Sequence, residues 1–332
     1  MLRPFLRLAA LVATAFATTS IAAPVPGGSI LVSQSGNGSG TPPSTGAQAS
    51  VRVFQTNGKE QFTIQIPTGS LQIQGTQGGR LALSPDGKFV GLAGYLPPFS
   101  GSGDLNTRND SDAPRGYVSI NAKNGGVSAP TKVRNQDQES ADTVVTDDDR
   151  AWLAGGDDLV YWKGKTDVVF NQGTFLNTIL PKGIRAFDGD LYLAGLRPNF
   201  FGFVANFNGF PHGDSDHPRV LFDVTNPEDF AVTDNGNTIY VARSEGVVDV
   251  YQKDKKWSVK YRLTAGNTAL HGVALDLSGE NPVVYAIDSN RLWKVVDKGV
   301  NANFKRIAGV KAGHAFLGIV VTPGGGAPQV KV

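Results

Sequence analysis

The chain has 332 residues, a formal net charge of +2 and no cysteine. The lack of cysteine excludes disulfide bridges, thiolate metal sites and a cysteine nucleophile. Its 31 Lys and Arg residues are scattered along the sequence, which does not suit a nucleic-acid-binding protein. With 41 glycines, 19 prolines and only 18% charged residues, the composition favours a turn-rich all-β fold.

Residues 1–22 have the pattern of a secretory signal peptide. Two arginines precede a mostly apolar run over 8–16, and small residues lead to a cleavage site after Ala22. The apolar run is too short to span a membrane, and no other segment approaches that length. We therefore expect a secreted, extracellular protein without a membrane partner, in which residues 23–332 form a single domain.

A hairpin motif recurs along the chain. Residues 80–95, RLALSPDGKFVGLAGY, form two apolar strands around a Pro-Asp-Gly turn. Similar hairpins begin at residues 80, 142, 185, 229, 271 and 317. Most starts lie about 44 residues apart, and two further apolar strands follow each of the first five hairpins. Four-stranded units at this spacing are typical of a β-propeller rather than a β-sandwich.

The last unit contains only its innermost strand, at 317–322. Three strands near the start of the mature chain, at 29–34, 51–55 and 61–66, would complete it. We predict an all-β, six-bladed β-propeller, closed by pairing of the C-terminal strand with the N-terminal strands. A seven-bladed ring is the alternative, and it would need a further blade within 96–141.

Two long connections, 35–50 and 96–116, lie in neighbouring predicted blades on the same rim. Each contains a glycosylation sequon, at Asn37 and at Asn109. Long loops on a rigid scaffold often carry binding function. The first loop also suits a disordered, glycan-bearing decoration, whereas the second contains Phe99 and charged residues that could fold over the ring's centre.

Charged residues stand at the heads of the predicted innermost strands, which would line a central channel. They could bind a polar ligand, through Arg pairing with an anion and His271 as an acid or base. Alternatively, they form a ring of salt bridges that plugs the channel. The set is Arg80, Asp142, Arg185, Glu228, Asp229 and His271.

Three further features concern histidines and metals. His314 lies just before the last innermost strand, on the same predicted rim as His271. The motif HGDSDH offers possible metal ligands, although short polar turns have similar sequences: His212, Asp214, Asp216 and His217. We predict no cofactor, with a divalent metal as the open possibility. No nucleophile-elbow, P-loop, Rossmann or zinc-protease motif occurs.

The stretches LALSPDGKFVGLAGY and FAVTDNGNTIYVARSEGVVDVY resemble the hairpins of the YVTN and lactonase-like propeller superfamily. This resemblance implies a propeller whose ligands bind at the channel mouth. Lactone hydrolases and cyclases of that superfamily use metal carboxylates or His and Arg there. Arg80, Arg185 and His271 match this location but no single family motif, and six predicted blades depart from the usual seven.

From these features we expect a secreted, monomeric binding or interaction protein that uses the channel mouth and the loops 35–50 and 96–116. Its partner would be an extracellular polymer, a protein or a small polar ligand. The alternative is an extracellular hydrolase, lyase or lactonase-like enzyme. Its candidate catalytic residues are His271, Arg80, Arg185, Asp142 and Asp229.

Overall fold

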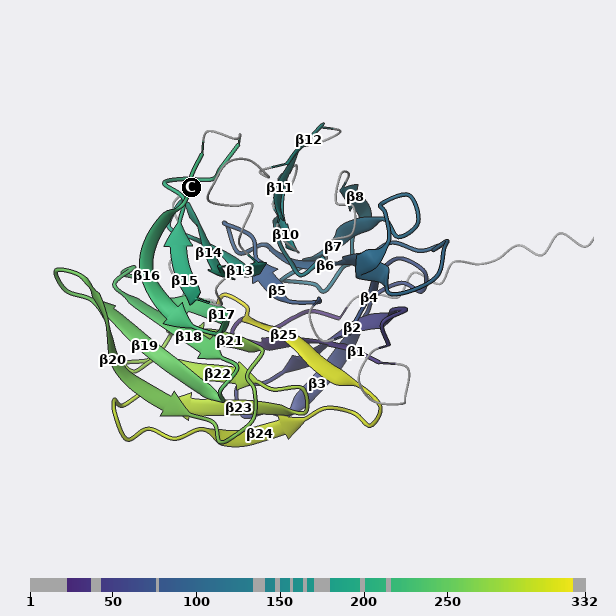
Figure 1. The fold of residues 1–332 in the computed structure, drawn as a ribbon. Coiled ribbons are helices and arrows are strands. Elements are labelled where there is room, and N and C mark those ends of the chain that lie inside the picture. Colours follow the sequence, from purple (N-terminus) through teal and green to yellow (C-terminus); the bar gives the residue numbers. More distant parts are fainter. Residues whose placement is uncertain are drawn as a thin grey trace, which may run out of the picture.

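The computed structural model has an all-β fold built from antiparallel sheets (Figure 1). It describes residues 23–36, 43–75, 78–133, 141–146, 150–155, 158–163, 166–169, 180–197, 201–212 and 216–324. A short 3-10 helix, η1 (Leu105–Thr107), is the only helical element in these ranges. None of the described helical structure is long and apolar enough to cross a membrane.

Five groups of four consecutive strands follow one another along the chain, and each group pairs in chain order. The first contains β5 (Leu81–Leu83), β6 (Phe89–Tyr95), β7 (Arg115–Asn121) and β8 (Thr131–Val133). The second contains β9 (Thr143–Thr146), β10 (Arg150–Gly155), β11 (Asp158–Lys163) and β12 (Thr166–Val169). The third contains β13 (Leu180–Phe187), β14 (Asp190–Leu196), β15 (Phe201–Asn206) and β16 (Arg219–Thr225). The fourth contains β17 (Pro227–Val232), β18 (Thr238–Arg243), β19 (Val247–Lys253) and β20 (Trp257–Thr264). The fifth contains β21 (Gly272–Asp276), β22 (Val283–Ile287), β23 (Arg291–Val296) and β24 (Lys305–Gly309).

A sixth group combines both ends of the described chain. Its pairing order is β25 (Ala315–Val321), β1 (Ile30–Ser35), β2 (Ala47–Phe54) and β3 (Glu60–Gln65). A two-residue strand, β4 (Gln72–Ile73), joins this group to the first one, because it pairs with both β2 and β6. We did not predict β4 from the sequence. Its signal is the alternation Leu-Gln-Ile-Gln over 71–74, which is too short to stand out from a linker.

The hairpin turns form for a local reason that recurs in different groups. In the turn between β5 and β6, the Asp86 carboxylate accepts hydrogen bonds from the Ser84 hydroxyl (2.7 Å) and the Lys88 amide (3.0 Å). Gly87 adopts a positive φ of 69° there, which glycine tolerates without steric cost. The turn between β17 and β18 has the same bonds from Thr233 and Asn237 to Asn235. These shared contacts explain why the two sequences look alike.

The hydrophobic core lies between consecutive groups of strands. Each large cluster of buried apolar side chains joins neighbouring groups. One cluster joins β21–β24 to β1, β2 and β25 through Tyr285, Phe54 and Phe316. The inner strands β5, β9, β13, β17, β21 and β25 contact one another in that order, and β25 contacts β5. In Figure 1 the fourth strands, such as β16, β20 and β24, lie at the periphery.

Candidate functional site

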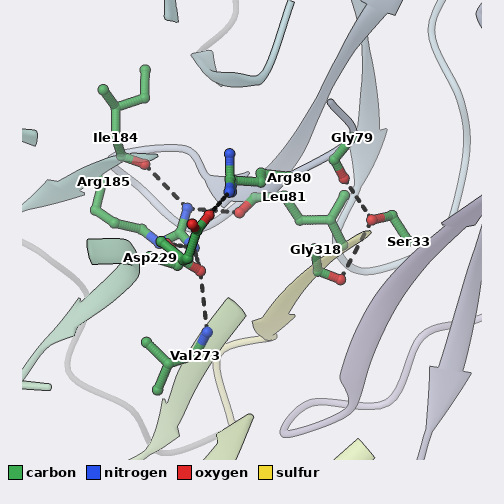
Figure 2. Close-up of polar contacts among 10 residues, drawn as sticks. Ser33, Gly79, Arg80, Leu81, Ile184, Arg185, Asp229, Val273 and Gly318 are labelled. Atoms are coloured by element: carbon green, nitrogen blue, oxygen red, sulfur yellow. Dashed lines mark hydrogen bonds and ion pairs between the residues drawn. The ribbon is translucent and has the colours of Figure 1, made fainter. Parts of the chain in front are cut away.

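Most of the predicted strand-head residues meet near the middle of the molecule. We call Arg80, Arg185, Glu228, Asp229 and His271 the central polar cluster. Arg80 and His271 directly precede β5 and β21, and both acidic residues lie near the start of β17. Arg185 differs from the prediction, because β13 begins at Leu180 and so places this arginine inside the strand. Residues far apart in the sequence therefore converge in one cluster (Figure 2).

Arg185 and Asp229 form the most buried ion pair of the cluster. Nη2 of Arg185 donates to both carboxylate oxygens of Asp229, at 2.6 and 2.5 Å. Asp229 is 0% exposed and also accepts a hydrogen bond from the backbone amide of Val273 at 3.1 Å. The other terminal nitrogen of Arg185 donates to the Leu81 carbonyl at 2.7 Å (Figure 2). This one pair thus ties together β5, β13, β17 and β21.

Arg80 pairs with Glu228 beside this bond. The ion pair measures 2.7 Å, and the Arg80 side chain is only 3% exposed. The backbone amide of Arg80 donates to the carbonyl of Asp142 at 3.0 Å, so the peptide of Asp142 also borders the cluster. Both arginines therefore have a carboxylate partner. This arrangement corresponds to the salt-bridge alternative of the sequence analysis.

Burial shifts the pKa values within the cluster. It raises the pKa of Asp229, against the opposing effect of Arg185 and Arg80. It also lowers the pKa of His271, and the positive charge of Arg80 adds to that effect. Nε2 of His271 lies 2.9 Å from the Ser289 hydroxyl, its hydrogen-bond partner. His271 is therefore held in its neutral form at pH values where an exposed histidine begins to take up a proton.

Arg185 also borders a largely apolar cavity between the inner strands. The volume of this cavity is about 190 Å³. Its walls come from β5, β13, β17, β21 and β25, and they include Leu83, Phe187, Val232, Leu275 and Ile319. Arg185 is the charged residue of its described lining, and its charge is already compensated by Asp229. This cavity accordingly offers little to a polar ligand.

The loop 96–116 is folded against its own core and against the other long loop. Phe99 packs with Tyr95, Leu105 and Ala113 rather than extending from the surface. The Leu105 amide donates to the carbonyl of Ser44 at 3.1 Å. The two long loops thus lie side by side where the structure describes them, as their shared rim predicts.

A buried arginine holds the same loop in place through hydrogen bonds to its backbone. Arg115 is 0% exposed, and its guanidinium donates to the carbonyls of Ala113 (2.8 Å) and Leu105 (3.3 Å). The group also lies over the Tyr95 ring, 5.3 Å from its centroid. The loop surface is therefore preorganised by side chains at its base. Asn109 is exposed on this surface, whereas Asn37 lies outside the described residues.

The remaining candidates make local contacts of their own. His314 is half-buried ahead of β25, and its Nδ1 lies 3.1 Å from the Ala312 carbonyl. In the HGDSDH turn, the Asp216 carboxylate accepts the backbone amide of His212 at 2.8 Å, which is ordinary turn chemistry. His217 is exposed, and Asp214 lies outside the described residues. No group of three or more potential metal ligands occurs within the described ranges.

Sequence reasoning missed two polar residues near the cluster. Ser33 donates to the Gly79 carbonyl, which directly precedes Arg80, at 2.5 Å (Figure 2). Ser289 is the partner of His271. The signal for Ser33 was a hydroxyl directly after the apolar residues 30–32 of a predicted strand, whereas Ser289 lies in a polar turn and had no distinguishing pattern.

Comparisons with known proteins bear on the fold alone. No family model and no curated protein matches the chain. It is similar to the solved structure of a hypothetical selenium-binding protein from Sulfolobus tokodaii, with 10% identity and a TM-score of 0.52, covering 90% of this chain and 94% of that one. It is also similar to the β-propeller domain of Cps50 (Swd1) from Myceliophteria thermophila, with 8% identity and a TM-score of 0.46, covering 83% of this chain and 96% of that one.

A third similar structure is the Dos1 propeller, with 13% identity and a TM-score of 0.44, covering 81% of this chain and 68% of that one. Of these three, only the first has a TM-score above 0.5. The paired sheets, the core between them and the likeness to the first of these structures support a β-propeller fold. The all-β prediction is confirmed, and the YVTN and lactonase-like assignment stays a prediction.

Proposed function

We propose that the chain is a six-bladed β-propeller closed by β25 and β1. The pairing of β25 with β1, from Ile30 opposite Val321 to Ser35 opposite Ala315, supports this closure. The sequence of contacts among the inner strands, which returns from β25 to β5, supports six units. A seventh blade would need strands within 96–141, where β7 and β8 are the strands of the described residues.

The proposed activity is that of a secreted binding protein. Its binding face is the rim that carries the loops 35–50 and 96–116, next to the channel mouth with Glu228 and His271. Its partner is an extracellular polymer, a protein or a small polar molecule. The single observation that carries this proposal is the packed loop 96–116, because a preorganised loop loses little conformational entropy on binding.

The pairing of the central charges favours binding over catalysis. An acid or base at this site needs a carboxylate or imidazole that can reach a substrate. Both oxygens of Asp229 are bound by Arg185, and Glu228 is bound by Arg80. These contacts support a structural role for the ion pairs, with His271 and the loops left as the contact surface.

The experiment is a binding screen on the purified protein against soluble extracellular polysaccharides and proteins. Two variants follow: replacement of residues 100–112 by a short Gly-Ser linker, and the double substitution Glu228→Gln, His271→Gln. Loss of binding in the loop variant, with unchanged circular dichroism, supports the proposal. Unchanged binding by both folded variants contradicts it. Lactone or ester turnover that disappears in H271Q supports the enzyme alternative instead.

Secretion and glycosylation belong to the same proposal. If residues 1–22 are removed as a signal peptide, the secreted protein begins at Ala23. N-terminal sequencing tests this prediction. The exposure of Asn109 is compatible with a glycan at its sequon. A mass shift that disappears in N109Q checks that modification, and metal analysis of the same material tests the turn at 212–217.

A further inference from the structure

A second site lies on the fifth group of strands, away from the central polar cluster. A groove of about 450 Å³ runs between β23, β24 and the loop that connects them. Its lining comes entirely from residues 294–307. We call it the lysine groove, because three of its lining residues are Lys294, Lys298 and Lys305. A groove of this size falls within the range of small-molecule sites.

The positive charges of the lysine groove are not compensated. Lys294 on β23 lies directly opposite Lys305 on β24, in the paired register of the two strands. Like charges at opposed positions of a sheet destabilise it. Within the part of the chain that the structure describes, none of these three lysines has an ion-pair partner. Lys294 donates to the carbonyl of Thr56 at 2.9 Å, and its ammonium group lies 5.8 Å from the centroid of the Tyr285 ring. These contacts position the ammonium group, but neither partner carries a full negative charge.

The nearest acidic residue in the sequence, Asp297, does not compensate them. Its side chain is buried, and one carboxylate oxygen accepts the hydroxyls of Tyr240 (2.5 Å) and Tyr261 (2.6 Å). The other oxygen accepts the backbone amide of Gly299 at 2.9 Å. Asp297 thus holds the start of the connecting loop, and its carboxylate is bound by the tyrosines of β18 and β20 rather than by the lysines.

The rest of the lysine groove is largely apolar. Val295, Val296, Ala302 and Ile307 line it, together with the amides of Asn301 and Asn303. Val296 and, in the adjoining loop, Val300 are 40% and 71% exposed. Exposed apolar side chains in a concave, charged setting are typical of a ligand site.

We infer that the lysine groove binds a small organic anion that has an apolar body and one carboxylate, sulfonate or similar head group. The head group would pair with the ammonium groups of Lys294 and Lys305, which occupy opposed positions of the two strands, with Lys298 in the same lining. The apolar body would cover Val296 and Ala302 and release water from them. This inference is independent of the proposed binding rim.

Protection of an exposed sheet edge does not explain the three lysines of the groove. Lysines on an outer strand such as β24 prevent association of sheet edges. Lys294, however, lies on β23, which is paired on both sides, and Lys298 lies in the loop. The convergence of all three on one groove points to a ligand.

The test uses the full chain and two fluorescent probes of the same shape. Anilinonaphthalene sulfonate has an apolar ring system with one anionic group, and N-phenylnaphthylamine has a matching ring system without it. We expect saturable binding of the sulfonate that weakens about tenfold or more in the triple variant Lys294→Gln, Lys298→Gln, Lys305→Gln, because charged hydrogen bonds are lost. The neutral probe should bind more weakly and respond little to these substitutions.

The matched control is Lys255→Gln, Lys256→Gln, which removes exposed charges from the turn between β19 and β20. It should leave the affinity for the sulfonate within about twofold, since nonspecific attraction is weak and screened. Equal binding by the triple variant and the parent overturns the inference, as does an equal loss in the control. Binding to phosphatidylserine vesicles without binding of the soluble sulfonate also overturns it, in favour of a membrane surface.

Discussion

The central polar cluster and the lysine groove use charge in opposite ways. In the cluster, Arg80 and Arg185 are buried, and each faces a carboxylate on β17. In the lysine groove, Lys294 and Lys305 face each other near the surface without a carboxylate partner in the described chain. A buried charge must be paired, whereas an exposed one can remain available to a ligand. The difference indicates which charges hold the inner strands together and which can act in recognition.

The largest expected effect comes from breaking the buried pair. Asp229→Ala should lower the free energy of unfolding by about 3–5 kcal/mol, because it leaves the Arg185 guanidinium buried without its carboxylate. Chemical denaturation followed by tryptophan fluorescence measures this. The control is Asp223→Ala, since Asp223 pairs with Arg197 at 3.3 Å but is 69% exposed. It should cost less than about 1 kcal/mol, and equal losses at the two sites would contradict the comparison.

An intermediate effect on the free energy of unfolding is expected when the pH is lowered and His271 takes up a proton. Burial and Arg80 lower the pKa of His271, while Glu228 and Asp288 oppose this shift. The unfolded chain therefore takes up a proton at higher pH than the folded one. The stabilisation from neutral His271 is fully present above the unfolded pKa of about 6.5, and it is lost as pH falls from there through the folded pKa.

One proton limits this dependence to about 1.4 kcal/mol per pH unit. The measurement is the free energy of unfolding of the parent and of H271Q between about pH 7.5 and pH 5. We expect the parent to lose more stability on acidification than H271Q does. An equally steep decline in both proteins would show that His271 does not contribute.

The smallest effect should come from relieving the repulsion in the lysine groove. Lys305→Gln removes one of two facing positive charges, so it should raise the free energy of unfolding by about 0.2–1 kcal/mol at low salt. The gain should nearly vanish in about 1 M salt, because the Debye length falls to about 3 Å. Thermal unfolding at both salt concentrations measures it, with K255Q as the neutral comparison. A loss of stability in K305Q would mean that Lys305 has a structural role.

Local features of the fold could be predicted because local contacts cause them. The Asp86 and Asn235 turns form from bonds within five residues, and therefore leave a repeated pattern in the sequence. The repeat spacing likewise placed the strands of each group. The strand β4 was not predicted because it has only two residues. It is a strand only because it pairs with β2 and β6, which are distant from it in the sequence.

The sequence predicted that charged residues would gather near the centre, but not which of them pair. The positions of Arg80, Arg185 and Asp229 relative to the repeat indicated that they would gather near the centre. Which carboxylate each arginine takes depends on strand registers and on packing between the groups of strands, which a single sequence does not contain. Arg80 and Glu228, for instance, are separated by 148 positions.

The sequence by itself determined the all-β class, the repeated hairpins and the rim on which the two long loops meet. Their causes are turn chemistry and period-two burial, which act over a few residues. Only the tertiary structure decided that the central charges are paired and that those of the lysine groove are not. A shift of register between Leu292 and Trp293 sets Lys294 opposite Lys305, and burial decides whether a charge must find a partner.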